Sequence, residues 1–354
     1  MIKKYLNRII EELLPLLAVP AALLIGAGML LALNANPIEA YGALFQGAFG
    51  DVSGLTQTLV KATPLLLVGL GVVIAFRGGV INIGAEGQII VGALATTALA
   101  VSAPQWPGWI LLPLCLLAGT ASGALWGSIP GFLKARLGVN EILSTVMMNA
   151  IATQLSNFLL RGPLIDPAEI EAGTRIAQSA LLPRQVWLLR LVPRTLLHSG
   201  VLIAIVLAVL VYIFLWRTTI GYRIRAVGLN PNASRYAGIP VPIYQALSLI
   251  LGGAFAGLAG AVEVMGVQHR MLEGLSGGYG FTGIVAALFG NLHPLGAIPA
   301  SILFGGLLVG ADQMQRTVQV PSALISTLLG LIVLLVVGSK VWTQYRARRR
   351  EINE

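Results

Sequence analysis

Two long stretches without a formal charge, separated by a short arginine-rich segment, constrain this chain more than any other feature. One runs from Thr195 to Trp216 and the other from Val241 to Val262, and each contains 22 residues. A helix rises about 1.5 Å per residue, so each stretch is long enough to cross a hydrocarbon core of about 30 Å. The sequence therefore predicts two transmembrane helices joined by the segment 217–240.

The composition extends this prediction to the whole chain. Hydrophobic residues make up 56% of the 354 residues, charged residues only 10%, and the mean hydropathy is +0.84. These values are typical of membrane proteins, so we predict an all-α polytopic membrane protein with about ten transmembrane helices in one domain, residues 1–354. Pro64 is predicted to kink or break one span. The apolar segment 281–289 is too short to cross a membrane and indicates a broken or tilted helix.

Two glycine-rich interruptions, 78–87 and 274–283, each precede an apolar segment. Internal symmetry of opposite orientation is common in transporters, so the chain is compatible with two inverted five-helix halves that contain broken or re-entrant segments. The sequence likeness between the halves is too faint to establish this symmetry.

The distribution of charge orients the chain in the membrane and argues against nucleic acid as a partner. The net charge is +9, but the basic residues lie at the ends of apolar stretches and form no basic face for a duplex. Counting spans from a first span at 13–33 to a last one at 321–338 places both termini in the cytoplasm. The same count places the loop 161–194 outside, although its five arginines oppose the positive-inside tendency. That loop is predicted to be solvated or to dock a soluble partner.

The first candidates for a transport pathway lie in the glycine-rich segment 78–88. Asn82, Glu86 and Gln88 directly precede an apolar span there. Polar groups within a membrane are tolerated only in a protein interior or a water-filled cavity, and an acid is costly unless it is paired or hydrated. We therefore predict that these side chains line the pathway. The alternative is that Glu86 lies at the cytoplasmic surface and stabilises the start of a helix through the helix dipole.

A second set of candidates lies in the predicted span 139–160. Asn149, Thr153 and Asn157 are spaced i, i+4 and i+8, which places them on one face of a helix. A polar stripe inside a transmembrane helix must face protein or water, so this stripe is also predicted to line the pathway. The alternative is hydrogen bonding between helices, which contributes about 0.6 kcal/mol per contact.

The segment 217–240 is itself a candidate for contact with a partner. It contains four arginines and no acid, which indicates a cytoplasmic loop that sets topology or touches anionic lipid. Its interior predicts a turn followed by a short helix that Asn232 or Ser234 would cap, a shape suited to docking. The residues predicted to make this contact are Arg223, Arg225, Gly228, Asn230, Asn232 and Arg235.

No metal or nucleotide site is predicted on this chain. Cys115 is the single cysteine, and His198, His269 and His293 lack zinc-binding spacing. The sequence contains no G-x-x-x-x-G-K-[ST] phosphate-binding loop. No cofactor is therefore expected on this chain, and a membrane enzyme is the least favoured class.

Four motifs in order carry a family resemblance. They are GGVINIGAEGQIIVGALA at 78–95, GVNEILSTVMMNAIA at 138–152, the segment 217–240, and GYGFTGIVAALFGNLHPLG at 278–296. Together they resemble the permeases of ATP-binding-cassette (ABC) importers for branched-chain amino acids, ribose and nucleosides, most closely the nucleoside branch. The resemblance covers most of the chain.

This resemblance implies a permease that imports a nucleoside by alternating access, with a simple sugar of the ribose type as the alternative substrate. It implies that the segment 217–240 is the coupling loop, in which Arg225 and Arg235 contact a groove on an ATPase subunit that carries ATP and magnesium. The further implied partners are a second, different permease and an extracytoplasmic binding protein or lipoprotein, in the lipid of the bacterial inner membrane. An ion-coupled secondary transporter is less favoured, because Glu86 is the main candidate for an ion relay and the arginine-rich segment would be unexplained.

Overall fold

The computed structural model describes residues 20–320 and the single positions 327, 330, 331, 334, 335 and 338. The start of the first predicted span (13–33) and most of the last predicted span (321–338) lie outside the described residues. The described residues fall into two compact units, residues 59–305 and residues 20–58 with those after 305.

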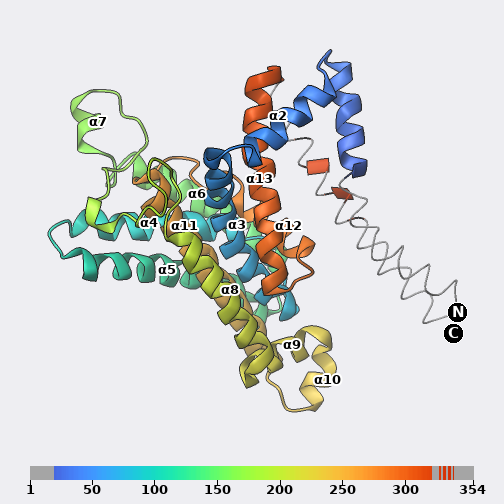
Figure 1. Ribbon diagram of the computed structural model, residues 1–354. Coiled ribbons are helices and arrows are strands. Elements are labelled where there is room, and N and C mark those ends of the chain that lie inside the picture. Colours follow the sequence, from blue (N-terminus) through green and yellow to red (C-terminus); the bar gives the residue numbers. More distant parts are fainter. Residues whose placement is uncertain (1–19, 321–326, 328–329, 332–333, 336–337, 339–354) are drawn as a thin grey trace, which may run out of the picture. The chain divides into compact units, whose positions relative to one another are not determined.

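The described part of the chain is helical and contains no β-sheet, only two isolated bridges between loop residues (Figure 1). In chain order its helices are Pro20–Ala32, α2 (Pro37–Phe49), α3 (Val52–Arg77), α4 (Ala85–Ser102), α5 (Gly108–Leu137), α6 (Glu141–Leu160), α7 (Pro167–Glu171), η1 (Arg184–Val186), α8 (Gly200–Arg217), α9 (Thr219–Leu229), α10 (Pro231–Tyr236), α11 (Val241–Glu263), the π-helical turn η2 (Val264–Gln268), α12 (Tyr279–Phe289) and α13 (Pro294–Val318).

Among the described residues, six helices are long and apolar enough to cross a membrane. They are α3, α4, α5, α8, α11 with η2, and α13. An all-helical protein with several apolar helices is therefore confirmed. The count of ten spans and the inverted halves stay predictions. The short apolar helix predicted at 281–289 is confirmed as α12, which begins two residues earlier.

Glycines bring the central helices of the unit 59–305 into close contact. A Cβ on Gly123 of α5 would overlap the carbonyl oxygen of Gly253 on α11, and one on Gly257 would lie 2.8 Å from the Cα of Gly123. Small residues allow helix backbones to approach closely, which is how membrane helices commonly pack. α3 and α11 are mostly buried, whereas α5 and α8 present most of their apolar surface outward.

The predicted effect of Pro64 is wrong in one respect, because α3 runs unbroken through it. Proline removes one backbone hydrogen bond and usually kinks or breaks a helix. The apolar window of α3 is 83% buried, so contacts with its neighbours offset that loss.

The unit formed by residues 20–58 and those after 305 contains α2, the start of α3 and the end of α13. Asn36 caps α2 by accepting a hydrogen bond from the Ile38 N–H at 3.0 Å. A cavity of about 400 Å³ in this unit is lined mainly by polar residues that the sequence analysis did not select. Among them are Gln46, Asp51, Gln57, Asp312, Gln313 and Arg316.

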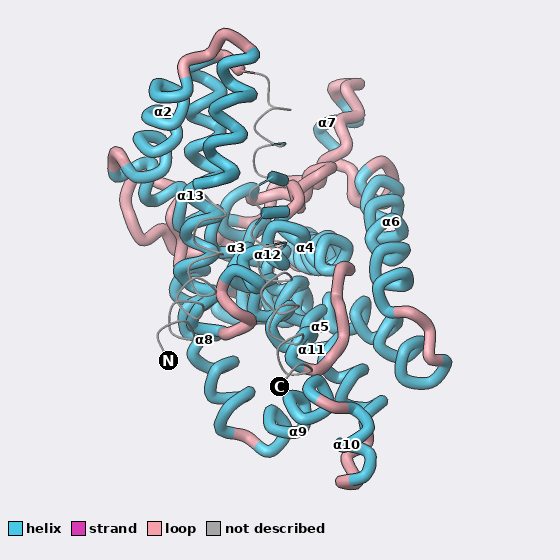
Figure 2. Tube along the Cα trace, turned by 90° about the vertical axis from the view of Figure 1, so that its right-hand side faces the viewer, coloured by secondary structure: helices cyan, strands magenta, loops and turns pink. Residues whose placement is uncertain are grey.

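Within the unit 59–305, two short helices mark opposite ends. Both Figure 1 and Figure 2 show α7 at one end and the pair α9–α10 at the other, with α8 running between these ends. The two arginine-rich segments of the sequence are therefore separated by the length of a membrane-spanning helix.

Candidate functional site

The glycine-rich segment after α3 forms an ordered loop that starts α4. Gly79 has φ +72°, a left-handed conformation that glycine adopts readily. Asn82 is buried, its Nδ2 donates to the Gln88 Oε1 at 3.0 Å, and its Oδ1 accepts from the Gly84 N–H at 3.0 Å. Asn82 and Gln88 thus satisfy one another and fix the first turn of α4.

The carboxylate of Glu86 joins this loop to the second glycine-rich segment. Its Oε1 accepts a hydrogen bond from the Gly278 N–H at 2.9 Å, and its Oε2 accepts one from the Gly280 N–H at 2.7 Å. The first N–H groups of a helix lack partners within the helix and attract negative charge. Glu86 therefore caps the N-terminus of α12 while it lies in the first turn of α4, and the two glycine-rich interruptions meet at one side chain.

Asn149 fastens α6 to the same loop. Its Oδ1 accepts from the Gly87 N–H at 2.8 Å, and its Nδ2 donates to the Ile83 carbonyl at 3.0 Å. A Cβ on Gly87 would lie 2.9 Å from the Cα of Asn149, so a larger residue there would force the helices apart. The structure thus brings Asn82, Glu86, Gln88 and Asn149 to one location.

The other two residues of the predicted stripe do not join this location. Thr153 is exposed and bonds to the Asn149 carbonyl of its own helix at 3.0 Å. Asn157 is half-buried and donates to the Gln154 side chain of α6 at 3.4 Å. The stripe is therefore divided into a fixed residue, Asn149, and an outward-facing end.

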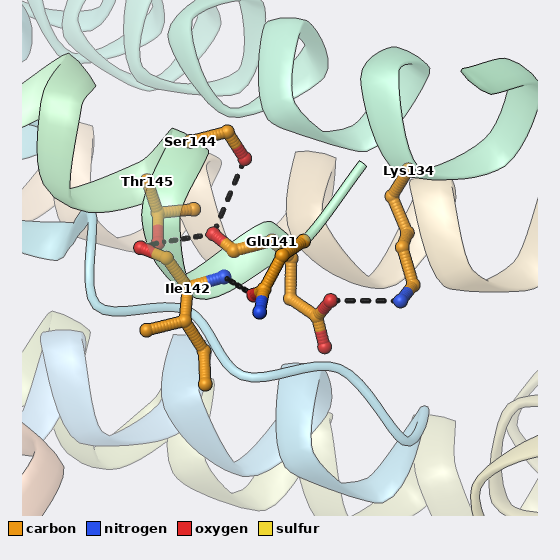
Figure 3. A network of polar contacts seen from close by, with 6 residues as sticks. Lys134, Glu141, Ile142, Ser144 and Thr145 are labelled. Carbon is orange, nitrogen blue, oxygen red and sulfur yellow. Dashed lines mark hydrogen bonds and ion pairs between the residues drawn. The ribbon is translucent and has the colours of Figure 1, made fainter. Parts of the chain in front are cut away.

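The turn between α5 and α6 sets the position of α6, as Figure 3 shows. Lys134 Nζ lies 2.8 Å from Glu141 Oε2, and Asn140 caps α6 by accepting from the Ile142 N–H at 2.9 Å. The Thr145 hydroxyl donates to the Glu141 carbonyl at 2.6 Å. These contacts hold the end of α6 that carries Asn149.

The segment 217–240 folds into two helices, α9 and α10, rather than one loop with a single short helix. The cap of α10 differs from the prediction, because Asn230 and not Asn232 or Ser234 accepts the hydrogen bond, from the Ala233 N–H at 3.0 Å. Pro231 follows at the first helical position, where its fixed φ and missing N–H cost nothing. The predicted short helix is confirmed, beginning at Pro231.

The predicted coupling residues have two different environments. Arg225 is half-buried and its Nε donates to the Leu215 carbonyl at 2.9 Å, while Arg223 Nη1 donates to the Tyr244 hydroxyl at 3.0 Å. Asn232 and Arg235 are exposed on α10. The first two arginines therefore hold α9 against its neighbours, and the last two residues face outward.

Gly228 lies inside α9 at a point of close backbone contact. Its φ is not positive, so backbone freedom is not the reason for glycine here. A Cβ on Gly228 would overlap the Arg77 carbonyl and lie 2.8 Å from the Gly79 nitrogen. The end of α9 thus packs directly on the loop that starts α4.

The loop after α6 is anchored at the other end of the unit. The Ser179 N–H donates to the Met271 carbonyl at 2.9 Å, and the Leu188 N–H donates to the Met265 carbonyl at 3.1 Å. His198 is buried beside them, and burial, followed by the charge of nearby His269, lowers its pKa to about 4. Among the described residues, no group of three or more His, Cys, Asp or Glu side chains could hold a metal ion.

Sequence reasoning missed residues that act through distant contacts. The Gly278 and Gly280 N–H groups are the partners of Glu86, and Arg77 and Trp216 contact the coupling segment. The position of Arg77 and Trp216 at the ends of apolar stretches was the signal present in the sequence. It does not reveal which helix ends meet.

Comparison with known proteins gives consistent matches over most of the chain. The family described as branched-chain amino acid transport system / permease component matches residues 54–337. The chain is 38% identical over 334 residues to the guanosine ABC transporter permease protein NupP of Bacillus subtilis, which covers 94% of this chain and 95% of that protein.

Two further relatives are similar over comparable lengths. The glucose ABC transporter permease protein TsgB13 of Haloferax volcanii is 37% identical over 94% of this chain and 88% of its own. The nucleoside ABC transporter permease protein NupB of Lactococcus lactis subsp. cremoris is 34% identical, with 93% and 92% covered. Each of the three organisms has a second similar permease protein at 29 to 31% identity. No solved structure gives a significant match.

Proposed function

Because the chain belongs to the family of branched-chain amino acid transport permease components, we propose that it imports a nucleoside as one of two different permease subunits. Within this family it is the multi-pass membrane subunit of an ABC importer, and ATP hydrolysis belongs to a separate subunit. The family also implies a substrate-binding partner. The substrate, the second permease, the ATPase contact, the bacterial inner membrane and the cytoplasmic termini are our proposals.

The choice of a nucleoside rests on the names of the relatives. NupP is named for guanosine and NupB for nucleosides, while TsgB13, at nearly the same identity, is named for glucose and favours a sugar as the second candidate. Uptake of labelled guanosine, glucose and ribose by the assembled transporter in vesicles distinguishes them. We expect ATP-dependent accumulation of guanosine, and accumulation of a sugar alone would overturn the proposal.

The exposed end of the α6 stripe supports a shared pathway with a second permease. Thr153 and Gln154 are exposed on a helix that begins at the α5–α6 turn, and polar side chains facing lipid are costly. A water-filled route between two permeases would solvate them. The paired relatives from each organism also support a second, different permease.

Replacing Asn157 with Leu tests this route. Asn157 bonds only within α6 among the described residues, so the change leaves the contacts of α6 with its neighbours intact. We expect lower uptake with normal membrane insertion, while the neighbouring control Phe158→Leu keeps normal uptake. Asn149→Leu should also reduce thermal stability, because Asn149 binds two backbone groups outside α6. Normal uptake by Asn157→Leu would remove the exposed stripe from the pathway.

The observation that carries the ATPase contact is the exposed apolar surface of α9 and α10. Tyr222, Leu229 and Tyr236 are 61%, 84% and 95% exposed, next to the exposed Arg235 and Asn232. Tyr222 and Leu229 are spaced i, i+7, which places them on one face of α9, and apolar side chains gathered on an exposed face mark a protein-binding surface. The ATPase contact is therefore assigned to α10 and the outer face of α9, while Arg225 supports this face from inside.

Ala233→Asp tests this assignment with a matched control at the other end of α8. Ala233 is exposed in the first turn of α10, where a negative charge is compatible with the helix dipole, so the helix itself should persist. Ala168 also lies in the first turn of its helix, α7, one position closer to the cap Asp166 than Ala233 is to Asn230, and it is also exposed. We expect Ala233→Asp to abolish copurification of the ATPase and Ala168→Asp to leave it unchanged. Normal copurification with Ala233→Asp would refute the assignment.

A further inference from the structure

Trp216, at the end of α8, contacts residues from the end of α3, from α9 and from the turn between α12 and α13. The guanidinium carbon of Arg77 lies 5.4 Å from the centre of its ring, and that of Arg225 lies 5.3 Å away. The ring of His293, in the turn between α12 and α13, lies 4.9 Å from it. The ends of α3 and α8, the middle of α9 and the turn after α12 therefore meet around one indole.

Each of these arginines also donates to a backbone carbonyl of another segment. Arg225 donates to the Leu215 carbonyl in the last turn of α8, and Arg77 Nε donates to the Leu292 carbonyl after α12 at 2.9 Å. The last carbonyls of a helix lack partners within the helix and form the negative end of its dipole. In addition to contacting the ring, the Arg225 guanidinium thus connects α9 to the end of α8, and that of Arg77 connects α3 to the turn between α12 and α13.

Arg77 and Arg225 both carry positive charge, and both guanidiniums lie close to the same ring. Among the residues that the structure describes, no carboxylate forms an ion pair with Arg77 or Arg225. Burial, followed by the charge of Arg77, lowers the pKa of His293, so this imidazole is neutral at pH 7 and adds no third charge. The electron-rich indole face and the carbonyls are what make the arrangement favourable. Removing the ring would leave two guanidiniums without their shared partner.

A second contact joins α9 to the membrane part of the chain. Gly228, near the end of α9, packs on the backbone of Arg77 and Gly79. Neither Gly228 nor Gly79 has room for a Cβ. A shift of α9 therefore displaces the loop 78–84, which carries Asn82 and leads to Glu86 in the first turn of α4, the residue that caps α12.

We propose that Trp216, with Arg77 and Arg225, forms the joint that transmits movement of α9–α10 to the loop before α4 and the turn after α12. The three side chains are positioning residues and touch no substrate. The inference rests on the proposed contact between α9–α10 and the ATPase, and it identifies how that contact reaches the membrane helices. The joint predicts that α9 and the α12–α13 turn move as one body.

Trp216→Leu in the complete transporter tests the joint, with Trp109→Leu as control. Trp109 lies 79% exposed in the first turn of α5, far from these contacts along the chain. Spin labels replace Ile220 on α9, which is not one of the residues assigned to the ATPase contact, and Leu295 at the start of α13. Both are exposed, and the labels are introduced in a Cys115→Ala background. Pulsed electron paramagnetic resonance then measures the distance between them, with and without nucleotide.

The control should show one narrow distance distribution in both states. In Trp216→Leu we expect a broadened distance distribution, while the ATPase still copurifies. We also expect about threefold more ATP to be hydrolysed per molecule transported, which is the factor that corresponds to the loss of one half-buried cation–π contact. Trp216→Phe keeps an aromatic face and should restore most of the coupling. If Trp216→Leu does not insert, Arg225→Gln gives the same readouts, because it removes one charge and the bond to Leu215.

A narrow distance and unchanged ATP consumption in these variants would overturn the joint. The failure of the ATPase contact has a different signature, since Ala233→Asp would then copurify normally. If Ala233→Asp loses the ATPase while Trp216→Leu and Arg225→Gln remain fully coupled, docking stands and the joint alone is refuted.

Discussion

The two short helices α7 and α10 begin with the same local signal and are attached to the molecule in different ways. Asp166 caps α7 by accepting a hydrogen bond from the Ala168 N–H at 3.1 Å. Asn230 caps α10 by accepting one from the Ala233 N–H at 3.0 Å. Each cap is followed by a proline, and each helix lies in an arginine-rich segment at one end of α8. An acidic or amide cap followed by proline therefore predicts a short helix at either place.

The contacts around the two helices differ in kind. α7 has no buried residue, and its Glu169 bonds to Thr174 and Gln178 of the same loop. α10 follows α9, whose Gly228 packs on the end of α3. A displacement of α7 can be absorbed within its loop, whereas a displacement of α9–α10 must move a membrane helix.

The largest expected difference between these ends is their side of the membrane. We expect a membrane-impermeant maleimide to label Thr174→Cys only from outside the cell and Ala237→Cys only from inside, in a Cys115→Ala background. Both positions are exposed, whereas Ser179 is buried with its hydroxyl accepting from Met271 and would label poorly at either side. Labelling of Thr174→Cys only after the membrane is opened would reverse the proposed topology.

The next largest effect concerns the backbone contact of α9. Gly228→Ala should prevent assembly of a coupled transporter, because its Cβ would overlap the Arg77 carbonyl, a rigid group that can yield only if α9 or α3 moves. Gly162→Ala in the loop before α7 is the matched control, since its Cβ would meet one carbonyl at 3.1 Å. ATPase copurification and thermal stability in detergent are measured for both variants. Equal behaviour of the two variants would mean that α9 is no more tightly held than the loop.

Local chemistry made several features predictable from the sequence. The uncharged stretches predicted α8 and α11, and the turn residues predicted a short helix near 231–236. The short apolar segment predicted α12. Each depends on neighbours within a few turns of the chain. The sequence predicts Asn232 or Ser234 as the cap, whereas Asn230 has this role, because each of these side chains can cap a helix and the sequence does not show where the helix begins.

The contacts that join distant segments could not be derived in this way. Glu86 bonds to residues 192 and 194 positions away, and Arg77 bonds to a residue 215 positions away. A glycine signals close approach but does not name its neighbour, and a half-buried arginine such as Arg225 has the same sequence context as the exposed Arg235. Tertiary packing decides these cases.

A smaller and pH-dependent difference is expected from the histidine at the α7 end. The pKa of His198 is lowered from 6.5 to about 4 in the folded protein, by burial and then by His269, so protonation favours the unfolded state. The free energy of unfolding is therefore not reduced by His198 above pH 6.5, where this residue is neutral in both states. It falls as the pH decreases from 6.5 toward 4, because the unfolded state then binds the proton more readily. At pH 5 the loss is about 2 kcal/mol. Protonation would also remove the acceptor for the Gly200 N–H at Nδ1.

Thermal unfolding at pH 7 and pH 5 measures this loss. We expect His198→Gln, which cannot titrate, to show a smaller fall in melting temperature than the parent protein over this range. Arg190 and His269 lie close enough to contribute electrostatically, so the comparison is made at constant ionic strength. An identical fall in both proteins would assign the acid sensitivity to another group.

The smallest effect should come from the arginine at the start of the loop before α7. Arg161 Nη2 lies 3.1 Å from Glu273 Oε2, but the two side chains are 65% and 46% exposed. Exposed ion pairs contribute about 0–1 kcal/mol, because water and salt screen the attraction and ordering the side chains costs entropy. We expect Arg161→Gln to change the free energy of unfolding by less than about 0.5 kcal/mol, with no change in uptake.

Arg225→Gln should lower the free energy of unfolding more than Arg161→Gln does, since Arg225 is half-buried and bonds a helix-end carbonyl. A double-mutant cycle with Glu273→Gln at low and high salt measures the pair directly. A coupling above about 1 kcal/mol that persists in high salt would show that the outer loop is clamped as firmly as α9.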